Sequence, residues 1–175
     1  VVIVTGQESA DAGDAQEESR PVIRNVTSTS FEVINYDDGG VSVAQDVGYI
    51  VMEEGNYVID GVEVEAGTYT TFGTPLTVGF SQAFTGNNVV VVDTIQQQTA
   101  HAYTSRFNLA SPPNSTGYEV FWESWDESNG GPGDGGGFIA GYIAVNAGQS
   151  SAKFEAGLET GCDADKGSND WCSVS

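Results

Sequence analysis

Near the C-terminus, acidic residues alternate in a way that suits the binding of a hard cation. Asp163, Asp165 and Asp170 surround Gly167, and calcium takes several carboxylate and carbonyl oxygens from a short segment that turns at a glycine. In the same segment Lys166 adds a positive charge, and the glycine comes one position earlier than in an EF-hand loop. A calcium site and a solvated turn both fit this pattern, and calcium is the one cofactor that the sequence suggests.

Cys162 and Cys172 flank this segment. Their spacing is neither a Cys-x-x-Cys motif nor a zinc pattern. Joined in a disulfide, they would close a small loop and stabilise the fold by about 3 kcal/mol on the chain-entropy estimate. Disulfides persist in oxidising compartments, so this pairing predicts an extracellular or cell-surface protein. Two free thiols are the alternative.

The side chains best suited to binding a sugar are two tryptophans and a neighbouring acid. Trp122 ends a predicted strand, and Trp125 and Asp126 follow it in a polar segment. Exposed indole rings could stack on a sugar ring while the carboxylate bonds to its hydroxyls. Strand alternation also places Trp122 on one face with Tyr118 and Val120, which favours a core position. Trp122, Trp125 and Asp126 are therefore sugar-binding candidates with a structural alternative.

Catalysis has little support, and we expect no enzyme. The one histidine, His101, lies in a polar segment with no cysteine nearby, and no Gly-x-Ser-x-Gly motif occurs. Two Asn-x-Ser/Thr patterns, at Asn25 and Asn114, are acceptors for N-glycosylation. Each precedes one of two matching predicted strands, so we expect both asparagines in exposed loops.

A shortage of basic residues limits the possible partners. The 175 residues include 25 Asp and Glu but only 5 Lys and Arg, which gives a formal charge of −20. Nucleic acids and anionic membrane surfaces would find too few cations, and no apolar stretch approaches the roughly 18 residues of a membrane span. We therefore expect no nucleic-acid partner and no membrane insertion. Hydrophobic residues, at 39% of the chain, suffice for a core.

The elements that must position these residues are strands. Short runs of β-branched and aromatic residues are bounded by Gly, Asn, Asp or Pro, no window has a sustained helical period, and 23 glycines disfavour helices. The sequence predicts an all-β chain with no substantial helix. The predicted strands span 1–5, 30–34, 47–52, 76–80, 89–92, 118–122 and 141–145.

Blocks of sequence recur in the same order. The match pairs 1–5 with 89–93, Arg24 with Arg106, 29–33 with 116–120, 48–51 with 141–144, and 65–67 with 155–157. A unit of about 90 residues with several short strands has the size of one β-sandwich. We therefore predict two tandem antiparallel β-sandwich repeats, at 1–67 and 68–157, followed by a disulfide-closed C-terminal segment at 158–175.

The two repeats differ at their start. The alternating strand at 76–84 precedes the second repeat, and the first repeat has no counterpart to it. The sheet of the first repeat is then short by one strand, and an unfilled place beside a strand is a template for strand addition. Trimming of an upstream strand, filling by another subunit and filling by the C-terminal segment are the alternatives. The expected assembly strand consists of Val1, Val2, Ile3, Val4 and Thr5.

Three blocks carry a family resemblance: Phe-Ser-x-x-Phe at 80–84, Asn-Val-Thr-x-Thr-x-Phe-Glu-Val at 25–33, and Val-Gly-Tyr-Ile at 47–50. Over residues 1–157 the chain resembles a repeat of secreted bacterial and archaeal proteins that is related to the H-type lectin domain. The resemblance implies an antiparallel β-sandwich. H-type lectins bind N-acetylgalactosamine-type sugars, often as trimers, but their sugar-contacting positions have no match in this sequence, so the resemblance implies the fold and not the sugar activity.

These expectations combine into one prediction and one alternative. We predict a non-enzymatic extracellular surface structural protein, such as a self-assembling filament or appendage subunit, that is completed by strand addition between copies of itself. The alternative is a carbohydrate-binding or adhesive module of a secreted protein, with glycans as partners.

Overall fold

The computed structural model describes residues 1–7, 20–36, 46–71, 75–96, 103–108, 110–124 and 138–148. Strands in every sheet run antiparallel to their neighbours, and these ranges contain no helix, so the all-β prediction is confirmed. In particular, they hold no helix of the length and apolarity needed to cross a membrane. The strands are β1 (Val2–Gln7), β2 (Arg20–Arg24), β3 (Glu32–Tyr36), β4 (Asp46–Val51), β5 (Gly55–Ile59), β6 (Val62–Thr71), β7 (Leu76–Gly79), β8 (Val89–Ile95), β9 (Tyr103–Phe107), β10 (Gly117–Ser124) and β11 (Phe138–Asn146).

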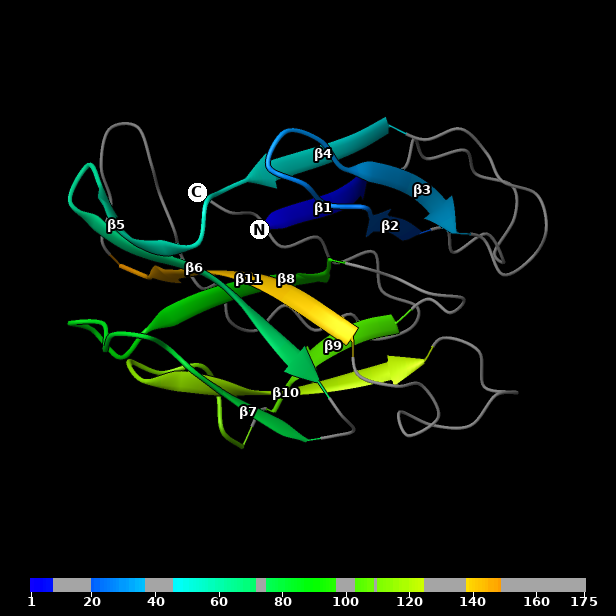
Figure 1. Cartoon of the computed structure of the whole chain (residues 1–175). Coiled ribbons are helices and arrows are strands. Elements are labelled where there is room, and N and C mark those ends of the chain that lie inside the picture. Colours follow the sequence, from blue (N-terminus) through cyan, green and yellow to red (C-terminus); the bar gives the residue numbers. More distant parts are fainter. Residues whose placement is uncertain are drawn as a thin grey trace, which may run out of the picture.

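Figure 1 shows β1-β4 and β2-β3 on one side of the four-stranded sheet β5-β6-β11-β8 and β7-β10-β9 on the other, with apolar side chains between the sheets. The sheet β2-β3 packs against β1-β4 through a cluster that includes Val4 and Ile23. On its other side, β1-β4 lies on the four-stranded sheet β5-β6-β11-β8, where Ile3 packs with Val64 and Ile143. The fourth sheet, β7-β10-β9, covers the far face of that sheet.

The largest core lies between the four-stranded sheet and β7-β10-β9. On β10 the side chains of Tyr118, Val120 and Trp122 alternate inward and are buried. The Tyr118 ring meets the rings of Phe107 and Tyr142 edge to face, with centroids 5.5 and 5.8 Å apart. Large aromatic rings supply much of the buried apolar area of such a core, so these two sheets pack face to face as in a β-sandwich.

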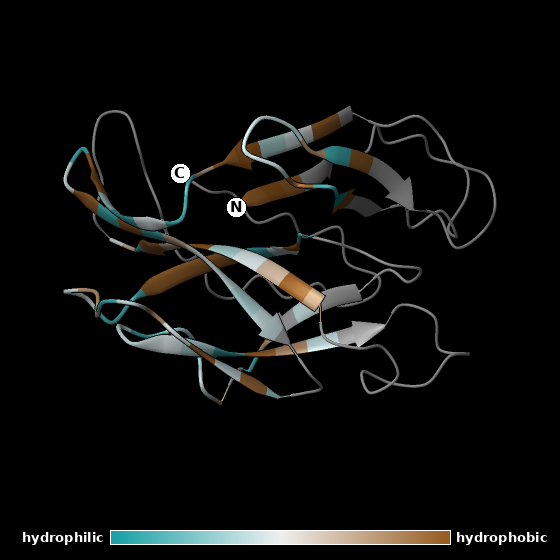
Figure 2. Ribbon diagram, in the orientation of Figure 1, coloured by the Kyte–Doolittle hydropathy of each residue, from teal (hydrophilic) through white to brown (hydrophobic). Residues whose placement is uncertain are grey.

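The first half of β1, Val2 to Val4, is apolar on both faces because it packs against two other sheets. Val2 and Val4 point toward β2-β3, and Ile3 points toward the four-stranded sheet. A strand that is covered on both faces requires a continuous apolar run, and β1 is brown beside the N-terminal label in Figure 2. The Gln96 side chain accepts a hydrogen bond from the Val2 N–H at 2.8 Å and donates one to the Val2 carbonyl at 2.7 Å. These bonds join β1 to the end of β8.

The β5–β6 hairpin carries the chain from the first half into the four-stranded sheet. Its turn residues Asp60 and Gly61 have φ angles of 51° and 90°. Positive φ at both positions is typical of a type I′ turn, for which Asp-Gly is a preferred pair. β6 then pairs with β11. Residues 67 and 68 both lie inside β6, so the predicted boundary between two repeats falls within one strand, and the division into repeats stays a prediction.

The strand pairings of the first half recur in the second half. β1 pairs with β4 as β8 pairs with β11, and Thr5 lies opposite Gly48 as Thr94 lies opposite Gly141. Likewise β2 pairs with β3, and β9 pairs with β10. The register matches Thr5 with Thr94, so the offset of this strand is 94 − 5 = 89 residues. The expected match of 1–5 with 89–93 was therefore displaced by one residue.

The match of the two arginines also needs correction. Arg24 lies opposite Glu32 and forms an ion pair with it at 2.6 Å. In the second half the residue that bonds to the matching Glu119 is Asn108, at 3.1 Å, while Arg106 lies opposite Phe121. The counterpart of Arg24 is thus Asn108, two positions beyond the arginine that sequence similarity suggested.

Gly117 provides a test of the close approach of β10 to β7. It lies opposite Gly79. A Cβ on Gly117 would lie 2.3 Å from the Val78 carbonyl oxygen, whereas a Cβ on Gly79 would meet only the Thr116 carbonyl oxygen at 4.0 Å. We expect Gly117→Ala to lower the free energy of unfolding by about 1–3 kcal/mol through overpacking. The matched variant Gly79→Ala should change it by less than about 1 kcal/mol. Denaturant unfolding followed by tryptophan fluorescence measures both, and equal midpoints would contradict the close approach.

Candidate assembly edge

Among the described residues, all four strands of the sheets β1-β4 and β2-β3 are paired on one side only, and two of them, β3 and β4, have counterparts in the second half that are paired on both sides. β4 pairs with β1, and β3 pairs with β2. Their counterparts are paired on both sides, because β11 lies between β6 and β8 and β10 lies between β7 and β9. A strand edge without a partner presents a row of backbone N–H and C=O groups that another strand can bind. The open sides of β3 and β4 therefore form the candidate site.

The side chains of β4 are exposed where those of β11 are buried. The Gly-Tyr-Ile sequence occurs in both strands. Tyr49 is 64% exposed against 4% for Tyr142, and Ile50 is 56% exposed against 6% for Ile143. The next residue, Val51, is 59% exposed. We call residues 48–51 with their open backbone side the β4 edge. Consecutive exposed apolar residues on an unpaired edge are what soluble monomers usually avoid.

Tyr142 shows what covers this position in the second half. Its ring lies over Gly67 of β6, where an added Cβ would be 2.6 Å from the Tyr142 hydroxyl oxygen and 2.7 Å from Cζ. The hydroxyl donates a hydrogen bond to Glu65 Oε1 at 2.6 Å. Burial and the Glu65 carboxylate raise the pKa of Tyr142 above its usual range, so the hydroxyl keeps its proton and stays a donor. A glycine and a glutamate two residues apart thus form the cover.

The ring of Tyr49 contacts an aromatic ring of its own half of the chain. Its ring meets Phe31 edge to face, with centroids 5.4 Å apart and planes at 68°. Tyr142 meets Tyr118 with centroids 5.8 Å apart and planes at 71°. The side of Tyr49 that faces β2-β3 is therefore built like the corresponding side of Tyr142. Within the described ranges, what it lacks is a strand in the place that β6 takes beside β11.

The expected assembly strand, Val1–Thr5, lies along β1 beside β4. Val2, Ile3 and Val4 are buried, and β1 pairs with β4 along its length. The Val1 amino group donates to the Met52 carbonyl at 2.9 Å, and the backbone of Val2 is bonded to the Gln96 side chain on the other side. The role of residues Val1–Thr5 in assembly stays a prediction, and the exposed apolar side chains of this sheet lie on the neighbouring strand β4, where an added strand would extend the β1-β4 sheet.

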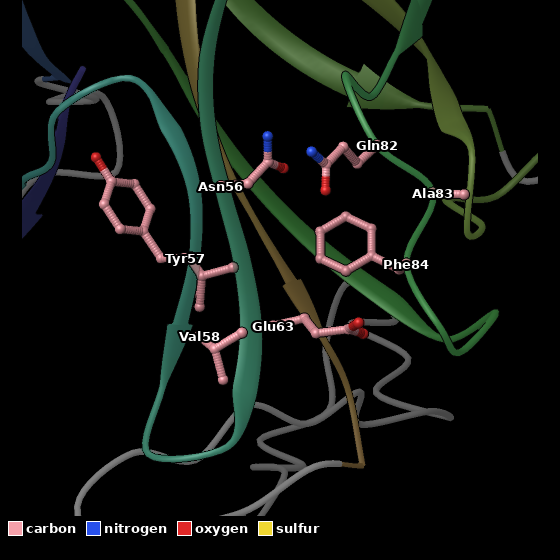
Figure 3. Close-up of a pocket in the computed structure, with 8 residues that line it drawn as sticks. Asn56, Tyr57, Val58, Glu63, Gln82, Ala83 and Phe84 are labelled. Carbon is pink, nitrogen blue, oxygen red and sulfur yellow. The ribbon is translucent and has the colours of Figure 1, made fainter.

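A small pocket, of about 280 Å³, lies between the β5–β6 hairpin and residues 82–84. Figure 3 shows Asn56 and Gln82 pointing toward each other near Phe84, with Tyr57 directed to the other side of the hairpin. Its mixture of amide and aromatic groups is the kind of lining that small polar ligands use.

The polar groups of this pocket bond within the chain. Glu63 Oε2 accepts hydrogen bonds from the Thr85 hydroxyl at 2.7 Å and from Asn146 Nδ2 at 2.6 Å. These bonds, that from Thr85 foremost, hold the pKa of Glu63 below its usual range. Asn56 Nδ2 donates to the Ser81 hydroxyl at 2.7 Å. Because these contacts join the hairpin to the segment after β7, they serve the fold.

Trp122 lies in the large core, where it belongs to a buried polar network. It is 3% exposed, and its Nε1 donates to the Tyr69 hydroxyl at 3.1 Å. The Tyr69 hydroxyl in turn donates to Asp93 at 3.0 Å, and the Ser105 hydroxyl donates to the same carboxylate. An indole in this position has no face free for a sugar ring in this structure. The sequence alone allowed this position and the exposed one.

The other predicted site residues divide into two groups. Asn25 and Asn114 are exposed, as expected for glycosylation acceptors, and their glycosylation stays a prediction. Asn25 has a φ of 51°, and Asn114 Oδ1 accepts a bond from the Thr116 hydroxyl at 2.8 Å. The residues outside the described ranges are Trp125, Asp126, Cys162, Asp163, Asp165, Asp170 and Cys172. Calcium binding, the disulfide and sugar binding accordingly stay predictions.

Asp93 should give stability a measurable pH dependence. Burial raises its pKa above the usual range against the hydrogen bonds from Ser105 and Tyr69. The folded chain then keeps the proton to a higher pH than the unfolded chain. From about pH 4 up to the folded pKa, this group makes the free energy of unfolding fall as pH rises.

We therefore expect Asp93→Asn to remove that component, so that stability changes less with pH in this window. Urea unfolding at a series of pH values measures the slope. The control is Glu63→Gln, where the lowered pKa of the carboxyl gives the opposite sign: its stabilisation is lost as pH falls. A slope that Asp93→Asn leaves unchanged would contradict the burial of a titrating carboxyl group.

Comparisons with known proteins leave the function to be inferred from this geometry. Neither models of protein families, nor curated proteins, nor solved structures give a match to the chain.

Proposed function

We propose that the chain is a non-enzymatic extracellular structural protein, of the kind that builds a surface filament or appendage, and that its copies join by strand addition at the β4 edge. The observation that carries the proposal is the contrast between two copies of one sequence motif. Tyr142 and Ile143 are buried in a strand that is paired on both sides, whereas Tyr49 and Ile50 are exposed in a strand that, among the described residues, is paired on one side only.

The composition of the β4 edge supports binding of a strand. Natural edge strands are protected against pairing by charged side chains, proline or a bulge, and residues 48–51 contain no charged residue and no proline. An added strand would gain backbone hydrogen bonds, and it would bury part of three apolar side chains at once. The edge is thus suited to another strand more than to a small ligand.

The resemblance to H-type lectin repeats is part of this proposal only as far as the fold is concerned. A carbohydrate-binding role would need an exposed aromatic platform, and Trp122 is inside the core. Strand addition uses groups that are already at the surface, and it agrees with the shortage of cations that makes nucleic acid and anionic membranes poor partners.

Substitution of Ile50 tests the proposal. Because Ile50 is largely exposed, Ile50→Lys should leave the fold intact while placing a charge where an added strand would cover it. Burial of an isoleucine side chain is worth about 1.5–3 kcal/mol, so we expect the concentration needed for assembly to rise at least about tenfold. Sedimentation velocity and electron microscopy of purified protein measure this. The control is Ile139→Lys, at a position that is 44% exposed on β11, whose two sides are already paired. Assembly equally weakened by both, or by neither, would count against the β4 edge.

Ionic strength should also matter, because each copy carries a formal charge of −20. Repulsion between copies is screened over about 8 Å at physiological salt and over about 3 Å at 1 M. We expect polymers to shorten or dissociate when salt is lowered and to re-form when it is restored. Light scattering during a salt titration follows this, with a parallel chelator titration to report any divalent cation. Polymer length that is indifferent to both would mean that the acidity serves solubility alone.

A further inference from the structure

We infer that segment 152–157 of one copy is the strand that binds the β4 edge of the next copy. The inference rests on the proposed function and names the occupant of its open edge. The segment lies outside the described residues, and its sequence, Ala-Lys-Phe-Glu-Ala-Gly, aligns with Val-Glu-Val-Glu-Ala-Gly at 62–67 in β6.

Two pairs of motifs occur in the chain, and the structure joins one member of each. Glu-Ala-Gly is found at 65–67 and 155–157, and Gly-Tyr-Ile at 48–50 and 141–143. In the four-stranded sheet, Gly67 lies opposite Tyr142 and Ala66 lies opposite Ile143. The remaining Gly-Tyr-Ile is the β4 edge. The remaining Glu-Ala-Gly has the sequence of the strand that this edge lacks.

The same register on β4 would place Gly157 opposite Tyr49. At Gly67 any larger residue would meet the ring of Tyr142 at 2.6–2.8 Å, and Gly157 meets the same requirement for Tyr49. Glu155 would then stand where Glu65 stands, with its carboxylate in position to accept from the Tyr49 hydroxyl. A glycine and a glutamate at this spacing are the two features that cover Tyr142, and both are repeated in the segment.

The same register also places opposite charges across from each other and apolar side chains on the same face. It places Lys153, one of only 5 basic residues in the chain, opposite Glu53, which is exposed just after β4. In the four-stranded sheet the corresponding pair is Glu63 with Asn146, joined by a hydrogen bond of 2.6 Å. Opposite charges across a strand pair are favourable. Alternation puts Phe154 and Ala156 on the face of Ile50, where they would cover its exposed side chain.

The connection seen within the chain indicates a second copy as the donor. The Glu-Ala-Gly strand that follows β4 in sequence does not pair with β4; it pairs with β11, the Gly-Tyr-Ile strand of the other half. Segment 152–157 likewise comes after β11 in sequence, with a shorter stretch between them. If the segment also pairs with the Gly-Tyr-Ile strand that comes next rather than with the one before it, its partner is β4 of the following copy. Donor and acceptor are then different surfaces, a head-to-tail contact that continues into a filament unless its rotation closes a ring.

A mixing experiment on the full chain tests the inference. Ile50→Lys closes the acceptor edge and leaves the donor intact, and Gly157→Val blocks the donor and leaves the acceptor intact. Each variant alone should be a monomer by sedimentation velocity. An equimolar mixture should form two-chain particles and nothing longer, because one intact tail fits one intact edge. The control Ala152→Val, which copies the Val62 of β6, should assemble like the parent.

The outcomes separate this inference from the proposed function. If Gly157→Val assembles like the parent while Ile50→Lys does not, the donor is another segment and only the inference fails. If Ile50→Lys assembles like the parent, the proposed function fails as well. A photoreactive residue at Val51 in mixed ¹⁵N-labelled and unlabelled copies identifies the source of the tail. Cross-links to 152–157 that join two isotopes are expected, and cross-links within one isotope alone would mean that each tail closes its own edge.

Discussion

The burial of β1 between two layers determines the arrangement of the whole molecule. Val2 and Val4 pack in one core and Ile3 packs in another, so these three residues are buried on both faces of the strand. Gln96 holds it from the side, with both amide groups bonded to the backbone of Val2. Because a buried backbone group without a partner is costly, these two bonds let β1 lie at the junction of the two halves. The same junction leaves β4, on the other side of β1, as the outer strand.

The second constraint is the space around the tyrosine of the Gly-Tyr-Ile motif in β11. Tyr142 can lie flat over its neighbour because Gly67 has no side chain, and Glu65 satisfies its hydroxyl. Glu65 is itself 2% exposed, so its carboxylate is a buried polar group that depends on Tyr142 and on the Ser81 N–H. The cover is therefore a set of mutually dependent contacts.

Local sequence predicted the strands with long apolar runs and missed those that depend on tertiary contacts. β1, β4, β8 and β11 were all expected near their observed positions, because β-branched runs signal strands. β6 was not, since its Glu63 and Glu65 suggest an exposed segment and are accommodated in the sheet by hydrogen bonds from β11 and from the residues after β7. The candidate site lay beyond prediction from any local pattern. Tyr49 and Tyr142 have the same neighbours in sequence, and only the order of strands in the sheets makes one exposed and the other buried.

A high negative charge does not prevent association at an apolar strand edge, because the charges and the edge lie on different parts of the surface. Charged side chains of a strand project outward from the two faces of the sheet, whereas strand pairing uses the backbone groups at the edge of the sheet. A partner that docked on a broad acidic face would have to desolvate many charges, whereas an added strand pairs along one narrow edge, of which residues 48–51 are uncharged. Like-charged copies can therefore approach edge to edge once salt has reduced the long-range repulsion. For a chain with 25 acids and 5 bases, the proposed strand addition requires the desolvation of few charges. Its specificity would come from the packing of one tyrosine ring over one glycine.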